Sequence, residues 1–451
     1  MKMEGESALI KTNLTEWQFS LYPKYVLLPI DNKNRDQIKS SVKNVVYSEV
    51  IPRPLEQNLR LICVSDDALL NILDMDPNIV HSQDFIEFVA GRKFPYGALP
   101  VAHRYGGHQY GLWVGQLGDG RTHIIGEYVN RYQIQLKGSG PTPYSRSYDG
   151  RAALRSCVRE MVASEAMFYL GVPTTRSLAV VASDETIIRD RLYSGCPRRE
   201  RAGVLLRCSP SWLRFGSLEI LAKSGELGLL KQLTDFVIKV VVWNIAQLAN
   251  AMEGLLTPSQ QLHMSHVIKT LDTYCKNKIL ETFLLKIGLK KERWGDEELV
   301  EKLLDMMQHT GADFTATFRQ LAELEPCEMV SEIKLIEKWS LKRLSSHFSW
   351  GCWLDQYRER LDKEAVDTSS APGLFEDERR RRMLAVNPIY VPRNYMLHEA
   401  LVDAENDDFE KLRFLLQVIK NPYEQQPEAE ARGFSSPPPQ WAYTLKISCS
   451  S

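Results

Sequence analysis

Residues able to bind a phosphate group gather between positions 106 and 137. Six of the fifteen residues from Gly106 to Gly120 are glycine, where the average composition of the chain would give about one. Glycine adopts positive φ angles and lets the backbone approach a ligand closely, so this density indicates a segment shaped around a bound group. Arg121 follows at once, and Lys137 comes later. Because both side chains are cations, the pattern predicts a site for phosphate oxygens.

Two strands and a helix are predicted to position these groups. Apolar and polar residues alternate strictly over Tyr132–Lys137, which is typical of a half-buried strand and places Lys137 on its polar face. Its partner strand is predicted from about His123 to Glu127. A helix is expected from about Arg151 to Leu170, because apolar residues recur at helical spacing and a Gly and a Pro follow. Glu160 lies inside this helix.

The order of these features is that of kinase-like folds: a glycine-rich turn, a strand with a polar-face Lys, and a helix with a Glu. In such folds the glycine amides approach phosphates, the Lys pairs with them, and the Glu orients the Lys. Each signal alone is weak, because a glycine turn is more often a plain hairpin and a strand-end Lys is usually solvated. Together they favour a nucleotide site in which Lys137 and Glu160 form an ion pair.

The composition argues against several other classes of protein. The chain has 451 residues, enough for two or three domains, and its 56 Lys and Arg against 57 Asp and Glu leave a net charge of −1. This balance argues against general nucleic-acid or membrane-surface binding. No window approaches the roughly 18 apolar residues of a membrane-spanning helix. Eight cysteines without a C-x-x-C pattern indicate reduced thiols rather than a disulfide framework or a zinc site.

Beyond the nucleotide motifs, the sequence from about Leu218 onward is predicted to be helical, with an amphipathic stripe from Leu299 to Met307. Residues 363–382 are predicted to form a charged loop, and the tail from about Tyr423 is polar and then Pro-rich. Four segments are therefore predicted: an N-terminal extension packing on the small lobe over 1–90, a nucleotide-binding kinase-like lobe over 91–238, the helical remainder of a large lobe over 239–422, and a polar tail over 423–451.

Longer motifs connect the sequence to a known family. They follow one another as Tyr105–Gly111, Gly115–Arg121, Leu136–Arg146, Asp149–Arg151, Ala163–Met167 and Pro173–Arg176. These runs closely resemble the selenoprotein O (SelO) family, kinase-fold pseudokinases that act as protein adenylyltransferases. The resemblance covers nearly the whole chain from about residue 50. It implies an α+β, protein-kinase-like (pseudokinase) fold, with a mixed strand and helix nucleotide-binding lobe and a mainly helical, internally shortened second lobe.

The resemblance also implies an activity and a set of site residues. Family members bind ATP and transfer AMP to Ser, Thr or Tyr hydroxyls of proteins, with Mg²⁺ or Mn²⁺ as the metal. The implied nucleotide-binding residues are Gly118, Gly120, Arg121, Lys137, Asp149, Gly150, Arg207 and Arg214. Lys137 resembles the phosphate-binding Lys, and Glu160 its helix partner. Arg207 and Arg214 resemble two phosphate-binding arginines, which suits a guanidinium because it meets phosphate oxygens in a bidentate fork. The alternative is that both arginines are solvated surface residues.

One part of the family pattern is missing. Family members carry a segment resembling H-G-V-x-N-T-D-N, which supplies an Asp that acts as base and an Asn that binds metal. A second segment, D-Y-G-P-F-G, follows it and supplies another metal-binding Asp. Neither occurs here: family-like sequence runs to Ile238 and resumes at Trp243. The catalytic residues are therefore unknown and the protein ligands for a metal are absent. Because transfer from ATP relies on a metal to neutralise phosphate charge, catalysis is expected to be impaired.

Two other motifs were considered as substitutes. Asp313–Thr315 looks like a kinase metal motif that has lost its Gly, but it belongs to a helical stretch that matches the family elsewhere. His263 and His266 form an H-x-x-H without further candidate ligands. Two polar residues on a surface helix are the better interpretation of that pair.

The sequence leaves three hypotheses open: an adenylyltransferase, a truncated isoform that binds ATP or a partner without turnover, and a spliced or mis-assembled product that does not fold stably. Family-like sequence lies directly on both sides of Ile238, which favours the omission of one continuous segment over the gradual change of its residues.

The ending Ser448–Ser451 matches the family, some of whose members carry selenocysteine where this chain has Cys449. The match implies a redox role for Cys449, against an incidental tail cysteine. The family implies a mitochondrial location; the start shows no clear presequence, and a cytoplasmic location is the alternative.

Overall fold

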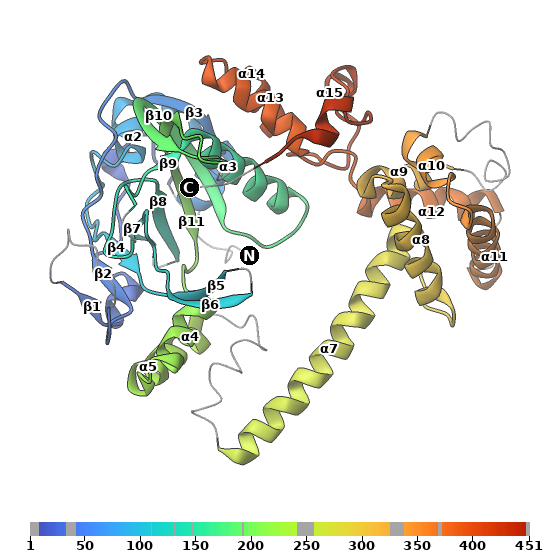
Figure 1. Ribbon diagram of the computed structural model, residues 1–451, viewed down its shortest axis with the longest axis horizontal. Coiled ribbons are helices and arrows are strands. Elements are labelled where there is room, and N and C mark those ends of the chain that lie inside the picture. The colour runs from blue at the N-terminus through green and yellow to red at the C-terminus, as the bar shows by residue number, and fades with distance from the viewer. Residues whose placement is uncertain are drawn as a thin grey trace. The chain divides into compact units, whose positions relative to one another are not determined.

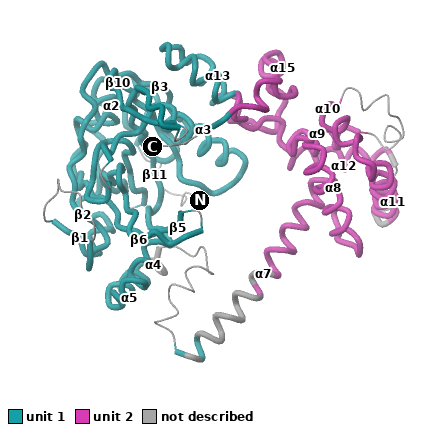
Figure 2. The backbone as a smooth tube through the Cα atoms, viewed as in Figure 1, with its two compact units in different colours: residues 1–265, 396–416, 446–451 teal, residues 266–395, 417–445 magenta. Residues whose placement is uncertain are grey.

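The computed structural model describes residues 9–32, 42–109, 111–129, 131–145, 148–191, 194–240, 257–324, 338–368 and 372–447. The chain forms two compact units (Figure 2). Unit 1 contains residues 1–265, 396–416 and 446–451, and unit 2 contains residues 266–395 and 417–445. The units cut across the four predicted segments, because unit 1 includes the predicted N-terminal extension, the predicted nucleotide-binding lobe and part of the predicted helical remainder.

Unit 1 is built on one mixed sheet with the strand order β1-β2-β4-β7-β8-β11-β10-β3, in which β9 also pairs with β11 (Figure 1). Strands β1 and β2 are parallel, and the other neighbours are antiparallel. The strands are β1 (Ile30–Asp31), β2 (Tyr47–Glu49), β3 (Arg60–Val64), β4 (Val101–His103), β7 (Thr122–Tyr128), β8 (Tyr132–Lys137), β9 (Ala152–Ala153), β10 (Arg176–Arg189) and β11 (Arg198–Ser209). A separate antiparallel ribbon joins β5 (Gly106–Gln109) and β6 (Leu112–Gln116).

Strand β8 begins and ends where the alternation predicts, and β7 is its antiparallel partner. Its polar face is nevertheless buried: Gln133 is 3% exposed and Gln135 is 0% exposed. The Gln135 amide accepts a hydrogen bond from the Arg207 guanidinium, and the Gln133 amide oxygen accepts one from the Trp212 backbone N–H. The alternation of β8 therefore marks a buried polar surface, because polar partners replace the water that a half-exposed strand would meet.

Helix α3 (Leu154–Tyr169) occupies the predicted helical stretch and packs against β10 and β11. The apolar residues that recur along it, Leu154, Val158, Met161 and Val162, are all buried. Each such side chain contributes about 1.5–3 kcal/mol when fully buried, so this face fixes the helix to the sheet. The helix ends at Tyr169 and is followed by Gly171, whose φ of 83° is the left-handed conformation that favours glycine.

The other helices of unit 1 cover both faces of the sheet. Adjacent residues of β7 point to opposite faces, so Ile124 packs in the core with Trp212 and Leu218 while Ile125 packs in the core with Leu69 and Phe88. The helices are α1 (Asp66–Leu73), α2 (Gln83–Val89), α4 (Phe215–Lys223) and α5 (Leu227–Val240), with the short 3₁₀ turns η1 (Leu14–Glu16), η2 (Lys24–Leu27) and η3 (Pro77–His81). Most of α13 (Asn394–Glu405) and of α14 (Glu410–Val418) also belongs to unit 1.

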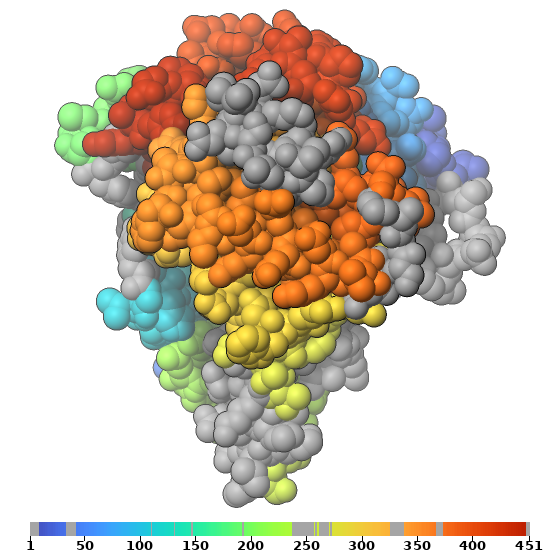
Figure 3. All heavy atoms as spheres, turned by 90° about the vertical axis from the view of Figure 1, so that its right-hand side faces the viewer, coloured from blue at the N-terminus to red at the C-terminus, as the bar shows by residue number. Residues whose placement is uncertain are grey.

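Unit 2 is helical, as the sequence from Leu218 onward predicts. Its helices are most of α7 (Pro258–Lys286), α8 (Asp296–Thr310), α9 (Phe314–Ala322), α10 (Trp339–Leu344), α11 (Trp350–Thr368), α12 (Pro372–Val386) and α15 (Pro427–Ala431), followed by the 3₁₀ turn η7 (Gln440–Thr444). The predicted stripe of α8 faces a core that includes Phe318, Trp353 and Tyr357. Side chains of α11 and α12, in orange, spread over the face that Figure 3 shows. In the described part of the chain, every helix is too short or too polar to cross a bilayer.

The predicted charged loop over residues 363–382 is wrong, because α11 runs to Thr368 and α12 begins at Pro372. Some of the charges of this region are buried and paired, while Asp377, Arg380 and Arg381 are exposed. Arg379 is fully buried and donates hydrogen bonds to the Tyr357 hydroxyl at 3.2 Å and the Leu324 carbonyl at 2.8 Å, and it also pairs with Glu376. A run of charged letters does not reveal such partners, since two of them lie far away in the sequence.

Candidate nucleotide site

A cavity of about 710 Å³ opens in unit 1 beside the end of β8, and we call it the β8 cavity. All of the predicted nucleotide-binding residues line it: Gly118, Gly120, Arg121, Lys137, Asp149, Gly150, Arg207 and Arg214. They come from the loop before β7, the end of β8, the loop before α3, β11 and the start of α4. The volume lies within the range of about 300–1,000 Å³ that is typical of small-molecule sites.

The β8 cavity is strongly cationic. Its lining contains the side chains of Arg121, Lys137, Arg151, Arg189, Arg207 and Arg214, against the carboxylates of Asp119 and Asp149. Clustered charges of one sign within a cleft focus the electric field and raise the local concentration of an oppositely charged ligand. The geometry therefore favours a polyanion such as a nucleoside triphosphate.

Glu160 connects two of these cations. Its two carboxylate oxygens pair separately with the Lys137 ammonium and the Arg207 guanidinium. Arg207 lies opposite Gln135 in the β8–β11 register, and Lys137 lies two residues along from Gln135, so both cations emerge on the same face. Burial alone would raise the pKa of Glu160, but Arg207 and Lys137 outweigh it and lower this pKa. The carboxylate therefore stays ionised and holds both cations in place.

Burial lowers the pKa of the two cations, Lys137 and Arg207, instead of raising it. It lowers the pKa of Lys137, and the neighbouring Arg207 lowers it further, while Glu160 opposes the shift. Arg207 is only 7% exposed, with its Nε donating to the Gln135 amide oxygen at 2.8 Å and its guanidinium 4.4 Å above the Trp212 ring. This burial rules out the alternative in which Arg207 is a solvated surface residue.

Arg214 and Arg121 have unused hydrogen-bonding capacity. Arg214 is exposed at the start of α4, with its guanidinium 4.7 Å above the Tyr105 ring, and forms no ion pair with the described residues. The Nη1 of Arg121 is buried and has no hydrogen-bond partner among the described residues. Burial also lowers the pKa of Arg121. A buried donor without a partner costs about 1–3 kcal/mol, which a phosphate oxygen in the β8 cavity would offset. The residues present thus fit the phosphates of ATP.

The glycines of the loop before β7 allow a tight packing contact. A Cβ on Gly118 would lie 2.4 Å from Tyr144 Cγ, and the φ of Gly118 is 68°. A Cβ on Gly120 would lie 2.9 Å from the Tyr144 carbonyl oxygen. The absence of side chains therefore lets the turn at Tyr144 pack against this loop. The glycines shape one wall of the cavity as well as leaving its backbone accessible.

Asp149 uses its carboxylate within the protein. Its Oδ1 accepts a hydrogen bond from the Arg189 guanidinium at 2.6 Å and another from the Arg151 backbone N–H at 2.9 Å. Burial would raise the pKa of Asp149, but Arg189 and Arg151 together outweigh it and lower this pKa. Gly150 beside it has a φ of 69°, and a Cβ there would lie 2.1 Å from the Gly140 carbonyl carbon. This pair therefore holds the rim of the cavity together.

Comparison with known proteins identifies the family. The family model described as protein adenylyltransferase SelO matches residues 31–240 and 239–420. The chain belongs to the SelO family. Curated SelO-family relatives named protein nucleotidyltransferase YdiU align over nearly their whole length. The protein of Azoarcus sp. (strain BH72) is 32% identical over 524 residues, covering 94% of this chain and 98% of the relative.

Two further YdiU proteins match similarly. That of Flavobacterium johnsoniae is 30% identical, covering 94% of this chain and 96% of the relative, and that of Xanthomonas axonopodis pv. citri is 31% identical, covering 94% and 99%. These names identify the SelO family as one of nucleotidyltransferases. The aligned length of 524 residues exceeds the 451 residues of this chain, so the Azoarcus relative carries residues without a counterpart here.

The structure also brings residues to the β8 cavity of this SelO-family chain that the sequence analysis missed. Arg189, at the end of β10, lines the cavity and donates a hydrogen bond to Asp149, 40 residues earlier, a contact that leaves no signal in local spacing. Arg151 and Tyr105 belong to the quoted family motifs but were not singled out. Asp119, between the two glycines, is buried and accepts hydrogen bonds from the His103 backbone N–H at 3.2 Å and the Gln135 amide at 3.3 Å.

The carboxylates that line the cavity do not form a metal site. Hard divalent cations require several oxygen ligands, usually including free carboxylates. Burial raises the pKa of Asp119, whose carboxylate accepts internal hydrogen bonds, and Asp149 is paired with Arg189. Among the described residues that line the β8 cavity, no second carboxylate converges on either of them. The described residues that line the β8 cavity therefore do not fit the Mg²⁺ or Mn²⁺ that the SelO family implies.

The motifs considered as substitutes do not provide ligands in the described residues either. Asp313 caps α9 through the Ala316 backbone N–H at 2.8 Å and pairs with Arg393. His263 and His266 lie on α7, and their side chains are outside the described residues, as is the whole of Cys449. Over the described ranges, the one cluster of potential metal ligands is Asp305, His309 and His347, which belongs to unit 2.

Proposed function

We propose that this chain binds ATP in the β8 cavity and is a protein adenylyltransferase of kinase-like fold. Its rate of turnover is proposed to be strongly reduced. The reaction assigned to the site is transfer of AMP from ATP to Ser, Thr or Tyr hydroxyls of other proteins. The observation that carries the proposal is the cation-lined cavity in which Glu160 bridges Lys137 and Arg207. The order of Gly-rich loop, Lys-bearing strand and Glu-bearing helix supports the kinase-like fold.

The residues of the cavity have distinct roles in this proposal. Lys137 and Arg207 bind phosphate oxygens from a position fixed by Glu160, and Arg214 and Arg121 contribute further donors. Fixed cations of this kind stabilise negative charge that develops on the phosphates, without needing to reorganise during the reaction. When bound, Mg²⁺ or Mn²⁺ would supply positive charge that neutralises the phosphates. The described residues do not supply a ligand set for it.

The reduced rate is proposed because the family's base and metal-ligand segments are absent from the sequence. The family match consists of two stretches that meet at residues 239–240, which supports omission of a block next to Ile238. Cations that hold phosphates equally well before and during the reaction do not by themselves accelerate it. The second candidate function is therefore a truncated isoform that binds ATP or a partner without turnover. We propose a mitochondrial location for either candidate, with a cytoplasmic location as the alternative.

The nucleotide site is tested by thermal unfolding with and without ATP. A ligand present at 100 times its Kd stabilises the folded state by about 2.7 kcal/mol, which raises the melting temperature of the wild-type chain. Lys137→Ala should abolish this ATP-dependent rise, because the substitution removes a central phosphate donor. Lys231→Ala, which removes an exposed Lys of α5 paired only with Asp235, is the matched control and should keep it. An unchanged ATP response in Lys137→Ala would remove the basis for the site assignment.

Incubation with labelled ATP, divalent metal and candidate proteins then separates the two candidate functions. The Azoarcus relative serves as the full-length comparison. We expect the relative to transfer label and this chain to transfer little or none. Robust labelling by this chain would contradict the proposed loss of turnover and establish it as an active enzyme. Binding without labelling would support the truncated, non-catalytic isoform.

A further inference from the structure

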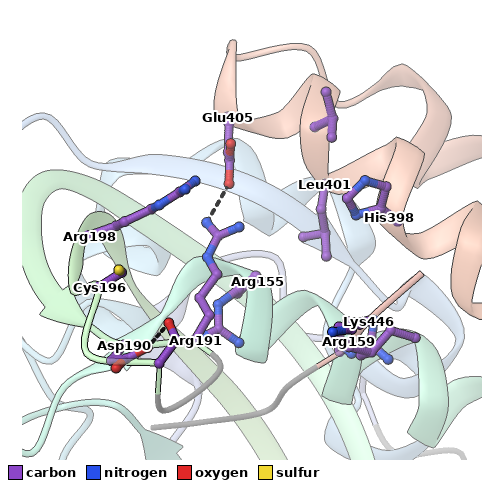
Figure 4. Close-up of a pocket in the computed structure, with 13 residues that line it drawn as sticks. Arg155, Arg159, Asp190, Arg191, Cys196, Arg198, His398, Leu401, Glu405 and Lys446 are labelled. Carbon is purple, nitrogen blue, oxygen red and sulfur yellow. Dashed lines mark hydrogen bonds and ion pairs between the residues drawn. The ribbon is translucent and has the colours of Figure 1, made fainter. Parts of the chain in front are cut away.

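A second cavity, of about 310 Å³, lies in unit 1 and shares no lining residue with the β8 cavity. We call it the α13 cavity (Figure 4). Its walls come from three places: α3, the segment that joins β10 to β11, and α13 with the two residues Lys446 and Ile447. These parts are far apart in the sequence, so only the fold brings them together.

The lining of the α13 cavity carries an excess of positive charge. Its cations are Arg155, Arg159, Arg191, Arg198 and Lys446, against the carboxylates of Asp190 and Glu405. Buried Glu200 adds a third carboxylate behind the lining. Even with Glu200 counted, the cations outnumber the carboxylates, so the cavity attracts anions.

Ion pairs hold the walls in place before any ligand arrives. Glu200, whose side chain is 3% exposed, accepts from Arg155 Nε and from Arg191 Nε, each at 2.6 Å. Arg191 also reaches Glu405 on α13 at 2.8 Å, as the dashed line in Figure 4 shows. Just beyond α13, Asp407 accepts a hydrogen bond from Arg201 at 2.6 Å. Because its walls are already fixed, the cavity loses little conformational entropy when a ligand binds.

Two of the cations are available to a ligand. Arg198 and Lys446 are exposed, and neither side chain has a hydrogen-bond or ion-pair partner among the described residues. In this they differ from Arg155 and Arg191, which both pair with Glu200 within the described part of the chain. A purely structural role in ion pairs would explain the paired arginines. It would not explain the unpaired positive charges of Arg198 and Lys446.

An apolar wall completes the cavity. Leu401 and Val402 of α13, together with Ile447, line it alongside the cations. A water molecule takes up about 30 Å³ of liquid, so a space of about 310 Å³ holds roughly ten. A bare phosphate ion would leave most of that space, and the apolar wall, in contact with water. The shape and chemistry therefore fit an anion that carries an apolar or ring-shaped body.

We infer that the α13 cavity is a binding site for a small phosphomonoester, with its phosphate held by the cationic lining, to which Arg198 and Lys446 add unpaired charge from opposite sides, and its body against Leu401 and Val402. A small molecule is favoured over a phosphorylated protein segment because the cavity volume is at the lower end of the small-molecule range of about 300–1,000 Å³. This site is independent of the function proposed for the β8 cavity. The two cavities still share an element, because Arg159 directly precedes Glu160 on α3.

The test uses phenyl phosphate as the probe, titrated calorimetrically into the full chain. Wild-type protein should bind it saturably, and more tightly than inorganic phosphate, because only phenyl phosphate has a body for the apolar wall. The variant Arg198→Glu/Lys446→Glu should lose about tenfold or more in affinity, since two attractive charges become repulsive. Both positions are exposed, so the variant is expected to fold, and its circular dichroism and melting temperature check this.

Arg199→Glu is the matched control. Arg199 is the next residue of β11 and is also exposed, but it does not line the cavity, so the same change of charge should leave binding intact. Lys137→Ala should likewise leave it intact, because Lys137 lines only the β8 cavity.

Each other outcome contradicts the inference. Loss of binding in Lys137→Ala alone would place the probe in the β8 cavity. An equal loss in Arg199→Glu and in the double variant would indicate nonspecific attraction. The small-molecule assignment would also be overturned by no saturable binding of phenyl phosphate, or by a phosphoserine peptide that binds where phenyl phosphate does not.

Discussion

At the scale of single residues, the charge of Glu160 decides how the cations of the β8 cavity are arranged. Its carboxylate lies between the Lys137 ammonium and the Arg207 guanidinium. Without this negative charge the two partly buried cations would repel each other. The cations that lower the pKa of Glu160 are thus the same groups that it positions. Protonating Glu160 would remove its charge and weaken both contacts at once.

This arrangement predicts how stability depends on pH. A carboxyl group whose pKa is lowered by folding stabilises the protein above its unfolded-state value of about 4.3, and the stabilisation is lost as the pH falls through the folded-state pKa. Glu160→Gln removes this contribution, so wild-type protein should exceed the variant in free energy of unfolding by about 1–2 kcal/mol near neutral pH. The difference should shrink as the pH falls below about 4.3. Urea unfolding of both proteins over this pH range measures it.

Glu219→Gln on α4 is the control, because the Lys223 ammonium and the His108 imidazole each lie 3.6 Å from its carboxylate and both pairs are partly exposed. Its difference from wild type should be small and should change little with pH. A gap between wild type and Glu160→Gln that widens in acid would contradict the proposed charge state.

At the scale of elements, α3 is important because it carries Glu160 and lines the α13 cavity with Arg159. A buried ion pair joins this helix to the sheet. Glu165 of α3 accepts hydrogen bonds from Arg176, the first residue of β10, at 2.7 and 2.8 Å, and from the Ser65 hydroxyl at 2.6 Å. The Arg176 guanidinium also lies 3.5 Å from the centre of the Phe168 ring. The far end of α3 is therefore fixed by charge, and its middle by apolar packing.

Breaking this pair from one side should be costly. Arg176→Met leaves the buried Glu165 carboxylate without its main partner, and the loss in free energy of unfolding should be about 3–5 kcal/mol. Glu165→Leu should cost less, because Arg176 keeps its ion pair with Asp67 at 2.9 Å. The double variant should be more stable than the sum of the two single losses predicts, because neither charge is then left unpaired. Urea unfolding of the four proteins gives the coupling energy, and purely additive losses would show that the two residues act independently.

At the scale of the whole molecule, the two units have separate apolar cores. The described core residues of unit 2, from Leu284 to Met383, form one cluster, and those around the sheet of unit 1 form others. Unit 2 also contains a buried charge cluster of its own, in which Arg360 pairs with Asp296 at 2.7 Å and with Glu364 at 2.9 Å. All residues that line the β8 cavity belong to unit 1.

This division predicts that unit 2 can be weakened without losing ATP binding. Asp296→Asn leaves Arg360 short of a counter-charge and should reduce hydrogen-exchange protection in α8 and α11. ATP should still increase protection in β8, β11 and α3, because a ligand stabilises only the state that binds it. Hydrogen exchange of wild type and variant, each with and without ATP, provides the comparison. Loss of the ATP response in Asp296→Asn would show that the site depends on unit 2.

Local pattern and motif by themselves determined the family, the bounds of β8, the existence of α3 and eight of the residues that line the β8 cavity. Period-two and helical spacing are local properties, and family motifs keep their residues in order along the chain. Three points stay predictions: the roles of those residues, the redox role of Cys449, and the effect of the missing segment. Tertiary structure alone decided that Gln133 and Gln135 are buried, that residues 363–382 are mostly helical, and that Arg189 reaches the cavity. It also created the α13 cavity. These features depend on partners distant in sequence, and local spacing does not encode which distant groups will meet.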